Sequence, residues 1–169
     1  KSLDFFNTSK ILLNKHEPYL KRYVYSLVLE NKISEAINTV KKNKSENQFF
    51  ESYLLLTIDS LKRDNFTKAY DYLSESKKLT EQNRFNLAIL DSLKDYVFVF
   101  KKKQLPSETK NFGNLSIISS TFQRCYLKDI KTDSFFLNLI NNNDSDFTRY
   151  IFFYLAHLIE NNKIIDAKE

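Results

Sequence analysis

The stretch NKISEAI at residues 31–37 returns in related form as DNFTKAY at 64–70 and as NNKIIDAKE at 161–169. In each copy, polar residues precede an apolar residue, and an alanine follows three positions later. Ala69 lies 33 residues after Ala36, and Ala167 lies 98 residues after Ala69, about three times that interval. A period of this length is typical of stacked helical hairpins. The sequence therefore predicts an array of repeats.

The composition indicates an all-α fold. Of the 169 residues, 42% are hydrophobic and 15% are aromatic, which is enough to build a packed core. The chain has one glycine and two prolines, so it lacks the tight turns that all-β folds need. We therefore predict helices that are joined by short polar linkers.

The spacing of apolar residues places these helices in successive pairs. In the first pair, Leu20, Tyr23, Val24 and Leu27 follow helical spacing, and the helix that carries Ala36 comes next. The other helices are expected at about residues 50–61, 67–79, 80–100, 115–127, 133–140 and 147–160, after a weaker helical segment at 2–14. Ser134 falls close to the position expected for the next alanine.

Residues 101–114 interrupt this pattern. The alanine position of the third repeat should fall near residue 102, but residues 101–103 are all lysine, and Pro106 and Gly113 follow. Here the second helix of the repeat is either short or replaced by a loop. Long loops in compact arrays are uncommon and are sometimes functional. We interpret residues 1–169 as one array with a single irregular repeat.

The repeat resembles the tetratricopeptide repeat family, in a divergent bacterial form, whose unit is two antiparallel helices in about 34 residues. The resemblance rests on the small residue of the second helix (Ala36, Ala69 and Ala167) and on the large residue four positions later (Val40 and Leu73). Other family positions depart from the pattern: the tryptophan-like site holds Leu20, Tyr53 and Ile151, and the usual Gly or Ala site holds Val24, Thr57 and Leu155. The closing proline is missing. Other α-solenoids stack their hairpins by the same physics.

The resemblance implies a right-handed α-α superhelix, a solenoid of antiparallel hairpins of about 33 residues each. In such a solenoid the first helices line a concave groove, which binds an extended peptide or a helix of a protein partner. The groove residues implied by the family geometry are Lys21, Tyr25, Leu54, Ile58, Arg149 and Phe152. A simpler interpretation is that Leu54, Ile58 and Phe152 pack in the core.

The positive charge suggests an alternative function, in which the chain is a basic α-solenoid that binds nucleic acid. The formal net charge is +5. The lysine clusters fall at the ends of predicted helices, at Lys41, Lys42 and Lys44, at Lys77 and Lys78, and at Lys101, Lys102 and Lys103. Cations at helix C-termini complement the helix dipole, so structure alone accounts for them. We therefore rank a protein or peptide partner above nucleic acid.

Few residues are candidates for catalysis. His16 and His157 are far apart, and we expect an exposed turn residue and a structural histidine, respectively. Cys125 is expected to be a buried, inert thiol, and a single cysteine excludes a disulfide framework and a multi-cysteine zinc site. The sequence has no glycine-rich phosphate loop, HExxH or GxSxG motif. We predict no enzyme activity, no metal and no cofactor.

The sequence shows neither a membrane-spanning segment nor a targeting signal. No apolar run approaches the ~18 residues of a membrane-spanning helix, and no signal peptide is visible. The chain starts at Lys1, contains no methionine and stops at Glu169 within a predicted helix, so we expect it to be a segment of a longer protein. The localisation stays open. The open ends of such an array are a route to homo-oligomers.

Overall fold

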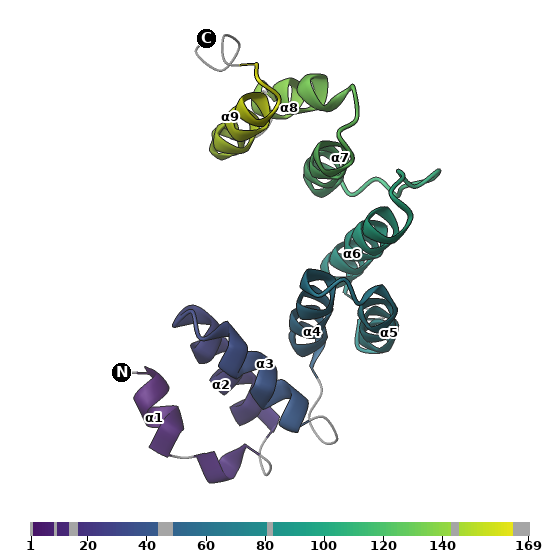
Figure 1. The fold of residues 1–169 in the computed structure, drawn as a ribbon. Coiled ribbons are helices and arrows are strands. Elements are labelled where there is room, and N and C mark those ends of the chain that lie inside the picture. Colours follow the sequence, from purple (N-terminus) through teal and green to yellow (C-terminus); the bar gives the residue numbers. More distant parts are fainter. Residues whose placement is uncertain are drawn as a thin grey trace. The chain divides into compact units, whose positions relative to one another are not determined.

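The computed structural model describes residues 2–8, 10–13, 17–43, 49–80, 83–142 and 146–163, and all regular structure in these ranges is helical (Figure 1). The predicted all-α class is confirmed. The helices are α1 (Ser2–Thr8), η1 (Lys10–Leu12), α2 (Glu17–Leu29), α3 (Ile33–Lys42), α4 (Phe50–Lys62), α5 (Phe66–Lys77), α6 (Arg84–Lys102), α7 (Asn114–Leu127), α8 (Thr132–Ile140), η2 (Thr148–Tyr150) and α9 (Ile151–Glu160). The predictions for His16, Lys44 and Ala167 lie outside the described residues.

The chain divides into two compact units, Lys1–Leu90 and Asp91–Glu169, and the boundary between them falls within α6. In the first unit, α2 packs against α3, and α4 packs against α5. Ala36 and Ala69 are both fully buried, as the repeat predicted. Their small side chains suit close approach of the paired helices, and larger buried residues such as Leu27 and Leu73 fill the space beside them.

Left-handed residues follow five of the described helices; one of them is Lys103 after α6, with φ 56°, and the other four share one kind of helix ending. Asn31, Asp64, Lys128 and Asn162 have φ between 53° and 60°. After each of them, the next backbone N–H bonds to the carbonyl five residues earlier: Lys32 to Leu27 (2.8 Å), Asn65 to Ser60 (2.9 Å), Asp129 to Arg124 (3.0 Å) and Lys163 to Leu158 (2.9 Å). This is the Schellman ending, which satisfies carbonyls at the helix C-terminus. These four left-handed residues are 33, 64 and 34 positions apart in turn.

In the second unit, α6 and α7 run in the same direction. The Ser92 and Ser119 hydroxyls, near the middle of the two helices, are 2.7 Å apart. Further along both helices, the rings of Phe100 and Tyr126 are 4.6 Å apart. The chain must therefore travel back before α7 begins. Residues 103–113, which we call the return strap, connect the end of α6 to the start of α7 without forming a helix.

Two contacts fix the far end of the return strap. Lys110 Nζ lies 2.8 Å from Asp91 Oδ2 on α6. The Ser116 hydroxyl on α7 donates to the Lys110 carbonyl (3.1 Å) and accepts from the Phe112 N–H (2.7 Å). Gly113 then enters α7 with φ 61° and ψ −129°. Positive φ with this ψ is open to glycine and strained for other residues.

Aromatic side chains hold α7, α8 and α9 together. Phe122 on α7 lies 5.8 Å from Phe136 on α8 and 5.1 Å from Phe153 on α9, measured between ring centroids. Phe136 is fully buried and also stacks on Tyr154 at 5.3 Å. Edge-to-face and offset pairs of this kind are favourable beyond the area they bury.

The small buried residue of α8 differs from the one expected. Ser134 is exposed, whereas Thr132 is only 1% exposed. The prediction for Ser134 was wrong because the buried face of α8 is formed by Thr132, Phe136 and Leu139.

Candidate functional site

Four of the six predicted groove residues lie on two helices of the first unit. Lys21 and Tyr25 are one turn apart on α2, and Leu54 and Ile58 are one turn apart on α4. Glu51, one turn before Leu54, joins the two helices because its Oε1 lies 3.1 Å from Lys21 Nζ. We call these five residues the α2–α4 surface.

The Tyr25 ring has a fixed place on this surface. It meets the ring of the buried Phe49 edge-on, at 6.4 Å between centroids. Lys21 Nζ lies 5.6 Å from the Tyr25 centroid and 5.7 Å from the Phe49 centroid. Cation–π contacts at this distance are attractive and restrict both side chains.

The charges on the α2–α4 surface stabilise one another. Burial would raise the pKa of Glu51, but the Tyr25 hydroxyl, a backbone hydrogen bond and Lys21 together hold it below 4.5. Burial would likewise lower the pKa of Lys21, but Glu51 raises it above 10.5. Burial and Glu51 raise the pKa of Tyr25. At neutral pH the surface therefore carries a fixed ion pair beside a neutral phenol.

Apolar atoms of the α2–α4 surface face solvent. Tyr25 is 39% exposed, Ile58 is 47% exposed and Leu54 is half-buried. The interpretation of Ile58 as a core residue is therefore wrong. Val28 and Leu29 are also exposed and extend the apolar area along α2.

The other two predicted groove residues belong to the second unit. The Arg149 guanidinium lies 5.1 Å from the centroid of the Tyr150 ring in η2. Phe152 is 78% exposed on α9, so the core interpretation is wrong for this residue too. Lys21, Tyr25, Leu54 and Ile58 thus share one unit, and Arg149 and Phe152 share the other.

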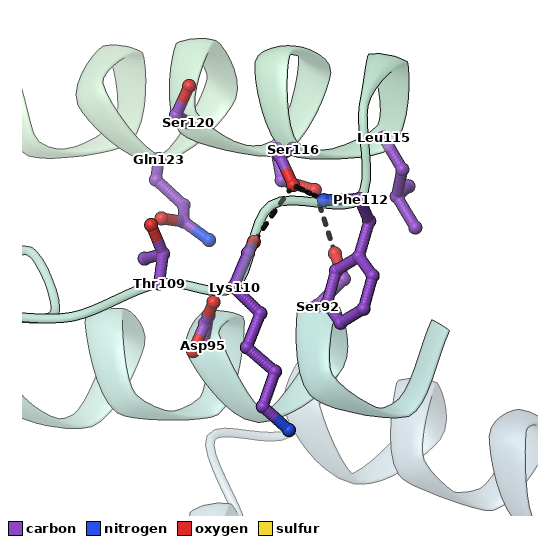
Figure 2. A pocket seen from close by; sticks show the side chains of 10 residues that line it. Ser92, Asp95, Thr109, Lys110, Phe112, Leu115, Ser116, Ser120 and Gln123 are labelled. Atoms are coloured by element: carbon purple, nitrogen blue, oxygen red, sulfur yellow. Dashed lines mark hydrogen bonds between the residues drawn. The ribbon is translucent and has the colours of Figure 1, made fainter. Parts of the chain in front are cut away.

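A small pocket opens between α6, the return strap and α7 (Figure 2). Its volume is about 30 Å³, which is room for about two water molecules. Eight of its ten lining residues are polar, and the lining consists of Ser92, Asp95, Thr109, Lys110, Phe112, Leu115, Ser116, Ser119, Ser120 and Gln123. The sequence marked this segment as irregular but named none of the lining residues as a site.

A second cluster that the sequence did not suggest joins α7, α8 and α9. Cys125 Sγ lies 3.7 Å from His157 Nδ1, and His157 Nε2 lies 3.0 Å from Asp133 Oδ1. The order is that of a nucleophile, a base and a residue that orients the base. However, burial and Glu160 raise the pKa of the Cys125 thiol, which therefore stays protonated at neutral pH. The cluster acts as a hydrogen-bonded link between three helices.

Metal-binding clusters and membrane-spanning helices are both absent from the described part of the chain. There, no group of three or more His, Cys, Asp or Glu side chains could hold a metal ion. Nor is any helix in those ranges both long and apolar enough to span a membrane.

The chain matches no protein-family model, no curated protein and no solved structure. Its function must therefore be argued from its own residues and geometry.

Proposed function

We propose that the chain is a non-catalytic scaffold of stacked helical hairpins that binds a protein partner, as a peptide or a helix, along its first helices. The spacing of the helices supports the repeat. The helices α2, α4, α6, α7 and α9 begin at Glu17, Phe50, Arg84, Asn114 and Ile151, at intervals of 33, 34, 30 and 37 residues. The Schellman endings are 33, 64 and 34 residues apart, which is one or about two such intervals. Both spacings support a tetratricopeptide-like unit of about 33 residues.

The return strap fits this proposal as a replaced helix. In an array of hairpins, successive first helices run in the same direction and a second helix brings the chain back. The helices α6 and α7 have this parallel relation, and residues 103–113 bring the chain back in extended form. The third repeat would then have its second helix replaced by the strap.

The observation that carries the proposal is the α2–α4 surface. It combines exposed apolar atoms of Tyr25 and Ile58 with the ion pair between Lys21 and Glu51. A partner that covers it can bury Ile58 together with a Tyr25 ring that Phe49 and Lys21 already hold in place, which lowers the entropic cost of binding. Buried aromatic anchors commonly dominate the affinity of protein interfaces.

A peptide selection tests the proposal. Peptides selected from a random library on the wild-type chain should bind the variant Tyr25→Ser/Ile58→Ser at least about tenfold more weakly, since both apolar anchors are removed. Isothermal titration calorimetry gives the affinity, and circular dichroism checks that the helices persist.

Phe85→Ser is the matched control, because Phe85 is 70% exposed in the same unit but lies outside the α2–α4 surface. Its peptide affinity should stay at the wild-type value. Equal binding by the folded double variant would contradict this assignment of the binding surface.

One observation favours the alternative, a polyanion such as nucleic acid. Because α6 and α7 are parallel, their C-termini lie together and bring Lys101, Lys102, Lys103 and Lys128 to one end of the pair. All four lysines are exposed. Binding to random oligonucleotides that weakens steeply with salt would support this alternative, and no binding at low salt would end it.

A further inference from the structure

Asp95 on α6 is a carboxylate that lines the pocket without a cationic partner. One turn earlier, Asp91 forms ion pairs with both nearby lysines, Lys110 at 2.8 Å and Lys94 at 3.6 Å. Asp95 has no ion pair or hydrogen bond to any other residue that the structure describes. Burial, followed by repulsion from Asp91, raises its pKa above 3.8, and the charges of Lys110 and Lys94 offset only part of this rise. A cation held beside Asp95 would relieve both effects.

Two further oxygen acceptors face the same side of the pocket. Gln123 of α7 is only 3% exposed, and its side-chain amide makes no hydrogen bond within the described part of the chain. Thr109 of the return strap adds a hydroxyl group. In Figure 2 the side chains of Gln123, Thr109 and Asp95 converge from α7, the strap and α6. Among the described residues the Gln123 amide is free to bond an occupant, so this side of the pocket favours a polar group.

The size and the rest of the lining narrow the choice of occupant. A pocket of about 30 Å³ admits a group about as large as one or two water molecules and excludes a whole metabolite. Phe112 and Leu115 are half-buried and line its other side. These two side chains offer apolar surface to a methylene stem, on which lysine side chains commonly pack.

We propose that this pocket, between α6, the return strap and α7, binds a primary ammonium group, the end of a lysine side chain in a peptide partner. Asp95, the Gln123 amide oxygen and the Thr109 hydroxyl supply three acceptors, which match the three N–H donors of an alkylammonium. The proposal rests on the proposed function, because it names one side chain that a bound peptide presents.

Contact rather than long-range attraction has to select this group. The formal net charge of +5 does not draw cations towards the chain. A potassium ion carries the same charge as an ammonium but has no N–H donors. Directed hydrogen bonds should therefore separate the two, and an acetylated lysine should not bind because it has lost its charge.

The test uses the full chain and small probes, so it does not depend on finding the partner. Nα-acetyl-lysine methylamide is titrated into the ¹⁵N-labelled protein, and the Gln123 side-chain amide signals are followed by NMR. A saturable shift is expected with this probe. Neither the Nε-acetylated probe nor potassium chloride at the same concentration should produce that shift.

Asp95→Asn should weaken binding of the lysine probe by about tenfold or more, because the charged acceptor is lost. Its fold should persist, since Asp95 has no partner to lose. Glu108→Gln is the matched control: Glu108 is an exposed carboxylate beside Thr109 that does not line the pocket, and its substitution should leave the affinity unchanged.

Three results would overturn the ammonium site. These are no saturable shift in the wild-type chain, equal affinity in Asp95→Asn, or the same shifts with potassium chloride, which would indicate an alkali-ion site. None of them bears on the α2–α4 surface. If selected peptides still lose affinity in Tyr25→Ser/Ile58→Ser, the proposed function stands without this subsite.

Discussion

Asp59 on α4 accepts a hydrogen bond from each of two cations, one of them on another helix. Lys41 Nζ of α3 lies 2.9 Å from its Oδ2, and Arg63 Nε lies 3.0 Å from its Oδ1. The side chain of Asp59 is only 10% exposed. Burial would raise its pKa, but Lys41 and Arg63 together hold it below 3.8. The contact between the first two hairpins therefore depends on the ionised carboxylate.

Asp59→Asn should lower the free energy of unfolding at pH 7 by about 1 kcal/mol, a modest value because both cations are largely exposed. A depressed pKa contributes stability above the pKa of the unfolded state, and this contribution is lost as the pH falls through the folded-state value. The difference between wild type and variant, measured by urea unfolding, should therefore be smaller at about pH 3 than at pH 7. Asp71→Asn, at an exposed position on α5, is the control. An equal difference at both pH values would contradict the assigned role.

Single residues were the hardest part of the site to predict from the sequence. Ala36 and Ala69 could be placed in the core because their interval repeats and small residues suit close helix contacts. The convergence of Cys125, Asp133 and His157 could not be foreseen, since the three residues follow no common spacing and come from three different helices. Asp95 likewise looks like any charge on an amphipathic helix until the return strap is placed beside it.

At the scale of elements, the loss of the alanine at position 102 marked where the pattern breaks. It left open whether a short helix or a loop follows, because a missing apolar stripe does not give the direction of the chain. The path is set instead by contacts between distant residues, such as Lys110 with Asp91. The pocket lies where the return strap, an extended segment thinner than a helix, runs beside α6 and α7.

Gly113→Ala tests the geometry of the return strap. At φ 61° and ψ −129°, a residue with a Cβ is strained, and the substitution should cost about 1–3 kcal/mol of stability. A Cβ at this position meets no atom within 4 Å, so backbone strain is the only expected cause. Thermal unfolding followed by circular dichroism measures the loss. Ser107→Ala, at an exposed strap position, should leave the midpoint unchanged. An unchanged midpoint for Gly113→Ala would mean that the strap takes another path.

At the scale of the whole molecule, the all-α class followed from composition and spacing, and most helix pairs were placed within a few residues of their ends. The exposure of Ile58 and Phe152 did not follow, because an apolar residue on an amphipathic helix has the same sequence signature whether it faces the core or a partner. The sequence alone therefore does not distinguish a core-facing from a partner-facing apolar residue. Only the position of the neighbouring helices distinguishes them.

The most direct test of the central claim is to map a selected peptide onto the ¹⁵N-labelled chain by NMR. The account predicts that backbone shifts concentrate on α2 and α4, around Lys21, Tyr25, Glu51 and Ile58, and that they disappear in Tyr25→Ser/Ile58→Ser. Shifts confined to α3 and α5, with α2 and α4 silent, would contradict partner binding along the first helices.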